Sequence, residues 1–248
     1  MKRASAFAAA LVFIVPVAAA GAGGSSIASD KGPITIHPVE HATFVMFWNG
    51  TMIAVDPVGD AESFDAFGKA DLVLITHTHG DHLSVETVQA VAKPSATIVA
   101  PKAVAERFPE TDRNRITVVA NGDSVTWGDA TIDAVPMYNL TPERQSFHPK
   151  GQGNGYVVTL GGARIYIAGD TEDIPEMRAL KDIDAAFVCI NLPYTMDVAA
   201  AADAVLEFKP AVVFPYHYRG KGGMSDLEKF SSLVARDPDI DVRILEWY

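Results

Sequence analysis

The stretch ADLVLITHTHGDH, residues 70–82, joins an apolar segment to a cluster of metal-ligand side chains. From Leu72 to Ile75 the chain is continuously apolar, which is typical of a strand buried on both faces. Four residues of the types that bind metals follow directly: His77, His79, Asp81 and His82. Helical periodicity begins after Ser84, so the sequence predicts a loop held between a strand and a helix.

The spacing within this loop predicts two metal ions. His77 and His79 are two residues apart and are expected to point the same way. Gly80 is expected to let the chain turn, so that Asp81 and His82 face a second ion. The alternative is that these are solvated or core histidines, but such a dense cluster of ligand types at a strand end favours a metal site.

The HxHxDH pattern resembles the signature of the metallo-β-lactamase superfamily. That resemblance implies an aspartate that bridges both ions after a later strand, and a last histidine after another strand. Asp170 ends the stretch IYIAGD at residues 165–170, and His217 follows the apolar run 211–216. Both are therefore expected to be metal ligands, with Asp170 in the bridging position.

One expected ligand departs from the superfamily pattern. The resemblance calls for a histidine near the end of the strand predicted at 130–137, but the chain continues Tyr138-Asn139. The nearest histidine before Asp170 is His148, so a longer loop has to carry it back to the first ion. The implied set of metal ligands is then His77, His79, Asp81, His82, His148, Asp170 and His217.

His37 and His41 are the two histidines outside this set. His41 lies in VEHATF (39–44), which resembles the Gly-His-Ala/Ser segment of the ascorbate-phosphate lactonase-like and N-acyl-phosphatidylethanolamine phospholipase D-like branches. Glu40 replaces the usual glycine. His41 is a candidate catalytic residue that contacts substrate or orients a ligand, with a core histidine as the alternative. His37 is expected to be structural.

The ligand set predicts a metal-dependent hydrolase. Imidazole and carboxylate favour two zinc ions, with manganese, iron or nickel as alternatives. Two such ions about 3.5–4 Å apart share a water whose pKa falls to about 7. The resulting hydroxide is expected to attack the carbonyl centre of a lactone or ester, with Asp81 and Asp170 as catalytic metal ligands. The preference for a carbonyl substrate rests on the resemblance alone.

Two other functions remain open at this point. A phosphodiesterase of the same fold would act on a phospholipid-like or nucleotide substrate. A non-catalytic periplasmic module would bind a metal or a partner, and the departure at Tyr138-Asn139 favours it. True β-lactamase activity is disfavoured, because Cys189 lies in an apolar run that reads as a buried strand and not as a metal ligand.

Two loops after predicted strands are candidates for substrate contacts. The first carries Tyr194, whose hydroxyl is a candidate donor to an oxyanion, with a packing role as the alternative. The second is glycine-rich and carries Tyr218, Arg219 and Lys221. Its basic side chains are candidates for holding a carboxylate or phosphate, with a solvated basic loop as the alternative.

Residues 1–22 have the pattern of a cleaved secretory signal peptide. Lys2 and Arg3 precede an apolar stretch, and small residues follow it, with cleavage expected after Ala20 or Ala22. The protein is therefore expected to be exported, periplasmic or secreted, with no stable membrane anchor after cleavage. A retained anchor is the alternative.

The remaining chain is predicted to be a flexible lead at 23–33 and one hydrolase domain at 34–248. Removing Lys2 and Arg3 from the 20 basic side chains leaves 18 against 31 acidic ones, a net charge of −13. This acidic balance argues against binding to nucleic acid. A small-molecule substrate is the expected partner.

The hydrophobic pattern predicts strands and helices throughout the domain. Strands are expected at 34–37, 44–48, 52–55, 70–75, 97–100, 116–119, 124–127, 130–137, 155–160, 163–168, 185–190, 211–216 and 240–245. Helices are expected at 84–92, 101–107, 174–181, 198–208 and 225–234. Each half begins with strands and continues with alternating strands and helices. This order fits the α/β metallo-β-lactamase fold, a four-layer αββα sandwich of two mixed β-sheets flanked by helices.

Overall fold

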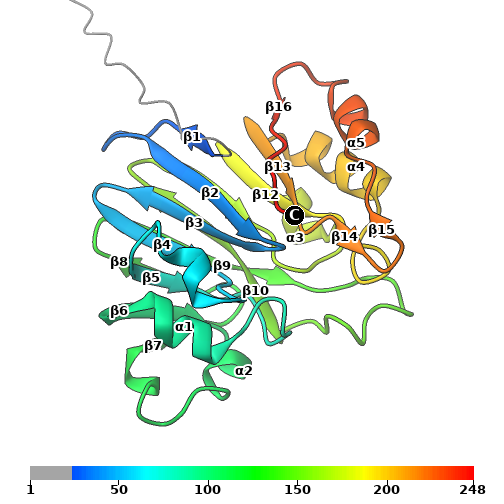
Figure 1. Ribbon diagram of the computed structural model, residues 1–248. Helices are drawn as coiled ribbons and strands as arrows, with labels where there is room; N and C mark the ends of the chain where they lie inside the picture. The colour runs from blue at the N-terminus through cyan, green and yellow to red at the C-terminus, as the bar shows by residue number, and fades with distance from the viewer. Residues whose placement is uncertain (1–23) are drawn as a thin grey trace, which may run out of the picture.

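Two seven-stranded sheets face each other in the computed structural model, which describes residues 24–248 (Figure 1). The first sheet has the spatial order β1 (Ser25–Ile27), β2 (Ile34–Glu40), β3 (Thr43–Trp48), β4 (Thr51–Val55), β5 (Ala70–Leu74), β6 (Ala92–Ala100) and β7 (Ile116–Val118). The second has the order β16 (Asp241–Val242), β13 (Val212–Tyr216), β12 (Ala185–Cys189), β11 (Ala163–Ile167), β10 (Gly153–Leu160), β9 (Ala130–Met137) and β8 (Ser124–Trp127).

Both sheets are mixed, and they repeat one pattern. β1 to β4 pair antiparallel and β4 to β7 pair parallel. In the second sheet, β8 to β11 pair antiparallel, and β11, β12, β13 and β16 pair parallel. Because parallel neighbours end at the same edge, the strands before each predicted ligand bring those ligands to one side.

Helices cover the outer faces of the two sheets (Figure 1). They are α1 (Val85–Val91), α2 (Lys102–Ala105), α3 (Pro175–Arg178), α4 (Val198–Phe208) and α5 (Leu227–Val234), with 3-10 turns η1 (Ala61–Phe64) and η2 (Arg113–Arg115). The hairpin of β14 (Arg219–Gly220) and β15 (Gly223–Met224) lies apart from the main sheets. The expected αββα sandwich is confirmed.

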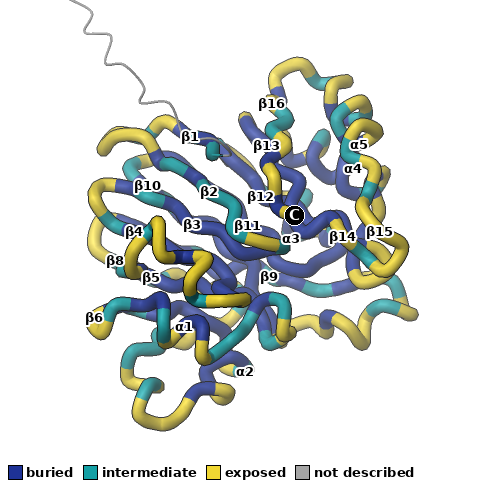
Figure 2. Tube along the Cα trace, in the orientation of Figure 1, coloured by how far each residue is buried: buried dark blue, intermediate teal, exposed yellow. Residues whose placement is uncertain are grey.

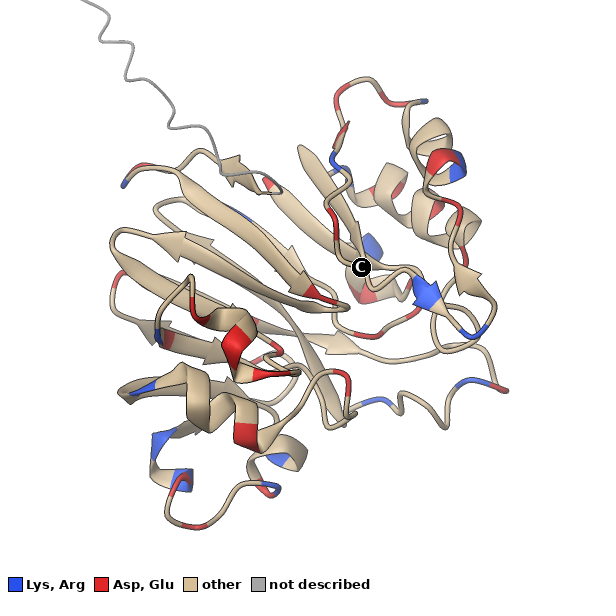
Figure 3. Ribbon diagram, in the orientation of Figure 1, with Lys and Arg blue, Asp and Glu red and all other residues tan. Residues whose placement is uncertain are grey.

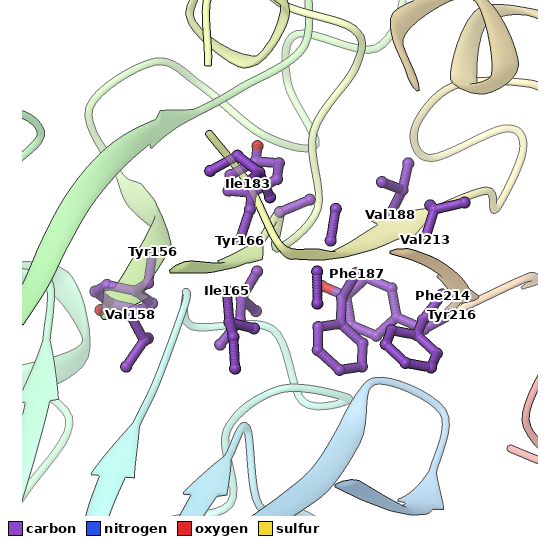
Figure 4. Packing of buried hydrophobic residues seen from close by; sticks show 14 of the residues in the cluster. Tyr156, Val158, Ile165, Tyr166, Ile183, Phe187, Val188, Val213, Phe214 and Tyr216 are labelled. Carbon is purple, nitrogen blue, oxygen red and sulfur yellow. The ribbon is translucent and has the colours of Figure 1, made fainter. Parts of the chain in front are cut away.

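The main hydrophobic core lies between the sheets and extends under α4 and α5. Phe44 of the first sheet stacks on Phe187 of the second, with ring centroids 4.2 Å apart. Phe187 in turn stacks on Phe214 at 4.9 Å (Figure 4). A second cluster fixes α1 and α2 against the first sheet through Val88 and Val104. These contacts make the sheets a rigid frame for the loops at their edge.

Exposed residues concentrate on the loops and on the outer sides of the helices (Figure 2). Acidic and basic residues are interspersed along the described chain and do not form one basic face (Figure 3). Among residues 24–248, no helix combines the length and apolar character needed to cross a bilayer.

The structure differs from the sequence prediction in two helices and at the termini. The helices expected at 101–107 and 174–181 are only the four-residue α2 and α3. The predicted signal peptide, 1–22, is outside the described residues. The lead at 23–33 was expected to be flexible, but β1 lies within it and pairs with β2, because Ile27 fits into the core. The strand expected at 240–245 is only the two residues of β16, since the chain then leaves the sheet.

Candidate metal centre

The predicted ligands come together where strands of both sheets end. β5 ends shortly before His77, β11 before Asp170, and β13 directly before His217. The turn before Asp170 requires Gly169, because this residue has φ +63° and a Cβ there would lie 2.6 Å from Met137 Sδ. Local backbone geometry at the strand ends therefore helps aim the ligands.

Gly80 does not have the role that the sequence suggested. Its φ lies outside the left-handed region, and a Cβ at this position would meet no atom within 4 Å. The turn is instead closed by the His79 carbonyl oxygen, which accepts the N–H groups of His82 and Leu83. Any residue with ordinary backbone angles can make this turn, so the expectation for Gly80 was wrong.

The first ligand group contains His77, His79 and His148, each with a ligand atom within 4.8 Å of the others. His148 Nε2 also lies 3.3 Å from Asp170 Oδ2. The structure therefore brings His148, from its longer loop, to His77, His79 and Asp170.

The second ligand group lies on the other side of the same carboxylate. Asp170 Oδ1 is 3.3 Å from His82 Nε2 and 3.4 Å from His217 Nε2. His217 Nε2 is also 3.4 Å from Asp81 Oδ2. Asp170 thus directs one oxygen toward each group, as a ligand shared by two ions would.

The donor atoms fit bound cations. His82 Nε2, His148 Nε2 and Asp170 Oδ1 are buried and have no hydrogen-bond partner among the described residues. A buried polar atom without a partner costs about 1–3 kcal/mol. Such atoms gathered around Asp170 therefore favour the binding of cations between them. Nitrogen and carboxylate oxygen are the ligands of zinc and similar divalent metals, and these residues would hold them.

The imidazoles and carboxylates of the cluster shift one another's pKa values. Burial opposes protonation of His82, but Asp170 and Asp56 outweigh it and raise the pKa of His82 well above its usual value. Burial would raise the pKa of Asp170, but His217 and His82 hold it well below its usual range. Burial, with His82 nearby, lowers the pKa of His77. A divalent cation would take over the role of the shared protons.

Asp56 and Thr76 orient ligands of both groups. Asp56, fully buried after β4, accepts the Thr76 N–H at 2.7 Å and the Thr76 hydroxyl at 2.6 Å. Its Oδ2 also lies 2.7 Å from His82 Nδ1, and Thr76 Oγ1 lies 3.0 Å from His77 Nδ1. Protons on both Nδ1 atoms leave both Nε2 atoms free as ligands. The sequence analysis missed this role, because Asp56 appeared only as the end of a strand.

The loop that carries His148 is pinned by Glu172. This carboxylate accepts the N–H groups of Leu140 and Thr141 at 2.7 Å each and pairs with Arg144 at 2.8 Å. Asn139, near the strand end where the resemblance calls for a histidine, donates its backbone N–H to the His148 carbonyl at 3.0 Å. Its side-chain Nδ2 lies 3.2 Å from His148 Nδ1. Asn139 therefore holds His148 through both its backbone and its side chain.

Asn191 is a second residue that the sequence analysis did not single out. It follows β12 and is buried, and its Nδ2 lies 3.1 Å from His217 Nε2. The Thr195 hydroxyl donates to Asn191 Oδ1, which fixes the amide with its N–H groups toward the centre. The signal in the sequence was its place directly after a strand that neighbours two ligand-bearing strands.

Two of the predicted substrate contacts, Tyr194 and Tyr218, have different surroundings. Tyr194 borders a cavity of about 170 Å³ next to His79 and Asp170, and its ring packs edge-on against Phe147 at 5.4 Å. Tyr218 is 9% exposed, and its hydroxyl donates to the Leu245 carbonyl at 3.4 Å. The polar end of Tyr218 is therefore already paired, and its contact with substrate stays a prediction.

The other candidates lie at different places around the centre. Arg219 borders a larger pocket beside Asp81, together with His41. Lys221 is exposed on the β14–β15 turn and borders none of the cavities next to the ligands. Burial lowers the pKa of His41 to about 4, so this histidine is neutral at neutral pH.

His37 and Cys189 lie outside the ligand groups, as the sequence indicated. His37 packs against Phe47 and Phe67. Cys189 is fully buried, its Sγ lies 3.4 Å from the Thr171 carbonyl oxygen, and burial raises the pKa of its thiol to about 12. A protonated thiol in the core is not a metal ligand.

The sandwich and the histidine and aspartate cluster together define a metal-dependent hydrolase of the metallo-β-lactamase fold. The family model of the β-lactamase superfamily domain matches residues 35–217. A UPF0173 metal-dependent hydrolase from Pyrococcus furiosus is 34% identical over 185 residues, which cover 72% of this chain and 80% of that protein. The chain belongs to the β-lactamase superfamily and, within it, to the UPF0173 metal-dependent hydrolases.

Solved structures agree with this assignment. A proposed metal-dependent hydrolase from Parabacteroides distasonis is 41% identical, with a TM-score of 0.81 over 91% of this chain and 99% of that one. Igni18, a metallo hydrolase from Ignicoccus hospitalis, has a TM-score of 0.72 at 24% identity, over 86% of this chain and 95% of that one. The second likeness supports the fold alone.

Proposed function

We propose that the protein is a binuclear zinc hydrolase that cleaves a lactone or ester at its carbonyl carbon. The observation that carries the proposal is Asp170, whose two oxygens face the two ligand groups at 3.3 Å from His148 and His82. Two ions sharing one carboxylate would lie close enough to act on one substrate. When bound, they supply hydroxide at neutral pH and positive charge beside the reacting oxygen.

The chain's own residues prepare this reaction in three ways. Asp56 and Thr76 keep protons on the Nδ1 atoms of His82 and His77, so that the Nε2 atoms are available for the ions. Asn191 directs a fixed hydrogen-bond donor toward the centre. The rings of Phe147 and Tyr194 border the adjoining cavity and give it apolar walls.

The preference for a carbonyl substrate can be tested directly. A phosphodiesterase acting on a phospholipid-like or nucleotide substrate is the alternative within the same metal chemistry. Turnover of a panel of lactones and esters, compared with bis(p-nitrophenyl) phosphate, separates the two bond classes. Higher kcat/KM for the phosphodiester would contradict the proposal. The third possibility, a non-catalytic module, is set aside because the homologues are hydrolases.

Metal stoichiometry of the purified protein tests the binuclear centre. We expect about two zinc ions per chain in the wild type and about one in Asp81→Ala, which should also lose most of its turnover. The sheets do not depend on this loop carboxylate, so the fold should remain. Asp65→Ala, an exposed acidic residue outside the cluster, is the matched control. Unchanged activity in Asp81→Ala would contradict a two-ion mechanism.

We also propose that the protein is exported, on the basis of residues 1–22. Expression of the full chain in a bacterial host should give a mature amino terminus after Ala20 or Ala22 in the periplasmic or secreted fraction. Amino-terminal sequencing measures this directly. An intact amino terminus that stays in the cytoplasm would contradict export.

A further inference from the structure

A pocket of about 590 Å³ opens beside the second ligand group. It lies between the β2–β3 turn, the loop of Asp81, Arg219 and the carboxyl-terminal segment 246–248. His41 joins this pocket to the metal centre. Its Nε2 is 3.7 Å from Asp81 Oδ2, and its ring centroid is 4.3 Å from that of His217.

Tyr248 holds the other ring nitrogen of His41. The Tyr248 hydroxyl lies 2.7 Å from His41 Nδ1 and accepts the backbone N–H of Arg219 at 3.3 Å. A hydroxyl has a single proton, and the Arg219 N–H occupies one of its acceptor positions. Its own proton is then available to His41 Nδ1. A His41 ring that accepts at Nδ1 has its proton on Nε2, toward Asp81.

The opposite tautomer fits these contacts poorly. With a proton on His41 Nδ1, the Tyr248 hydroxyl would accept twice and turn its own proton to solvent, because Tyr248 is 42% exposed. The bare Nε2 lone pair would also face the carboxylate of Asp81. His41, Asp81 and His217 are close enough together to hold an ion, but the hydrogen-bond chain from Arg219 through Tyr248 favours a proton on His41 Nε2 instead.

The backbone around His41 is fixed on both sides. His41 has φ +56° and donates its N–H to the Trp247 carbonyl at 3.3 Å, while its own carbonyl accepts the His217 N–H at 3.2 Å. The Tyr248 ring lies between Tyr218, at 4.9 Å, and the Arg219 guanidinium, at 4.6 Å. His41 is thus positioned before any substrate arrives, which is the condition for an effective hydrogen-bond donor.

We propose that His41 donates a hydrogen bond from Nε2 to the substrate oxygen that develops negative charge, and that Tyr248 is its positioning residue. The pocket then receives the polar part of the substrate. Its lining includes Glu246 as well as Arg219, so hydroxyl groups, which both donate and accept, suit it better than a group of a single charge. This inference rests on the proposed hydrolase function, but its first test does not require turnover.

The tautomer of His41 is measurable by nuclear magnetic resonance. Long-range 1H–15N correlations are recorded on zinc-loaded protein labelled at histidine. His41→Asn assigns the His41 signals, since asparagine tolerates a positive φ better than most residues. We expect a single Nε2–H tautomer in the wild type and a mixture in Tyr248→Phe. Tyr166→Phe, which removes a buried hydroxyl without a described partner, is the control and should leave His41 unchanged. An Nδ1–H tautomer, or a metal-bound Nε2, would overturn the proposal.

Metal content and kinetics complete the test. His41→Asn should keep the same number of ions as the wild type, while its kcat falls about 10²- to 10³-fold. His41→Gln, whose longer amide reaches toward the position of Nε2, should recover part of that loss. Tyr248→Phe should lower kcat about 10- to 100-fold with unchanged metal content. Loss of an ion from His41→Asn, or unchanged kcat in an active enzyme, would overturn the proposal. Failure of the hydrolase function would instead appear as a wild type that turns over no carbonyl or phosphoryl substrate, and the tautomer measurement would still decide the geometry.

Discussion

Replacing Asp56 with asparagine should weaken the second metal site, although Asp56 is not itself a predicted metal ligand. Asp56 Oδ1 accepts the Thr76 N–H, while Oδ2 lies 2.6 Å from Thr76 Oγ1 and 2.7 Å from His82 Nδ1. In Asp56→Asn, the remaining oxygen keeps the backbone bond. The new NH2 group then faces a hydroxyl and an imidazole nitrogen that both donated to the carboxylate.

The expected loss of metal affinity follows from the change of tautomer at His82. His82 can bond the asparagine NH2 only as an acceptor at Nδ1, which places its proton on Nε2, the atom 3.3 Å from Asp170. That proton competes with the ion. Loss of a partner that orients a ligand typically lowers metal affinity about 10- to 100-fold, or about 1.4–2.8 kcal/mol. His77 is linked to Asp56 only through Thr76, so the first site should lose less.

Zinc titration against a competing chelator measures both affinities. Asp71→Asn is the matched control, because Asp71 also accepts a backbone N–H, from Met52 at 3.1 Å, but lies near the start of β5. We expect weaker second-site binding in Asp56→Asn and wild-type binding in Asp71→Asn. Unchanged second-site affinity in a folded Asp56→Asn protein, or an equal loss in both variants, would refute the orientation argument.

Other predictions concern the first site, the thiol and the His148 loop. His148→Ala should lower first-site metal affinity, whereas His37→Ala should not, because His37 packs against Phe47 outside the ligand groups; equal metal loss in both, by elemental analysis, would contradict this. Burial raises the pKa of Cys189 to about 12, so a thiol reagent at pH 8 should label it only after unfolding, and fast labelling of the native protein would show that the thiol is accessible. Glu172→Gln should reduce the free energy of unfolding by about 1.5–3 kcal/mol in urea titrations at pH 7, because it loses charge-assisted hydrogen bonds. Since the pKa of Glu172 lies below its usual value, this contribution is present above about pH 4.3 and is lost as the pH falls through the lowered pKa; an equal difference between variant and wild type in strong acid would contradict it.

The parts of the site that the sequence predicts are those whose signal is local. The loop from His77 to His82 follows an apolar strand, and the same pattern of strand, turn and ligand marks Asp170 and His217. Each pattern predicts both a ligand type and its place, because the carboxyl ends of neighbouring parallel strands lie at the same edge of the sheet. The turn between the strands expected at 44–48 and 52–55 is local in the same sense, because Asn49 and Gly50 have the positive φ values, +49° and +76°, that a two-residue hairpin turn needs.

The parts that sequence reasoning missed depend on contacts between distant segments. Asp56 meets His82 across 26 positions, and Tyr248 meets His41 across 207. Neither pair has a spacing that helical or strand periodicity can predict. A buried aspartate after a strand and a tyrosine near an exposed terminus are ordinary features until the sheets bring them together. The same holds for Tyr218, which follows His217 in sequence but directs its hydroxyl to the Leu245 carbonyl, 27 positions away.

His148 shows how the fold can supply a ligand from a place that the local pattern does not predict. The strand β9 ends at Met137 and is followed by Tyr138-Asn139, where the resemblance calls for a histidine. The chain then makes a loop, and Glu172 fixes the start of that loop through Leu140 and Thr141. The backbone bond from Asn139 to the His148 carbonyl closes the loop at its other end. A ligand on a loop normally costs conformational entropy when it binds, but this loop is held closed at both ends before the ion arrives. The departure from the pattern therefore does not keep a histidine away from the centre, because the fixed loop places His148 beside His77, His79 and Asp170.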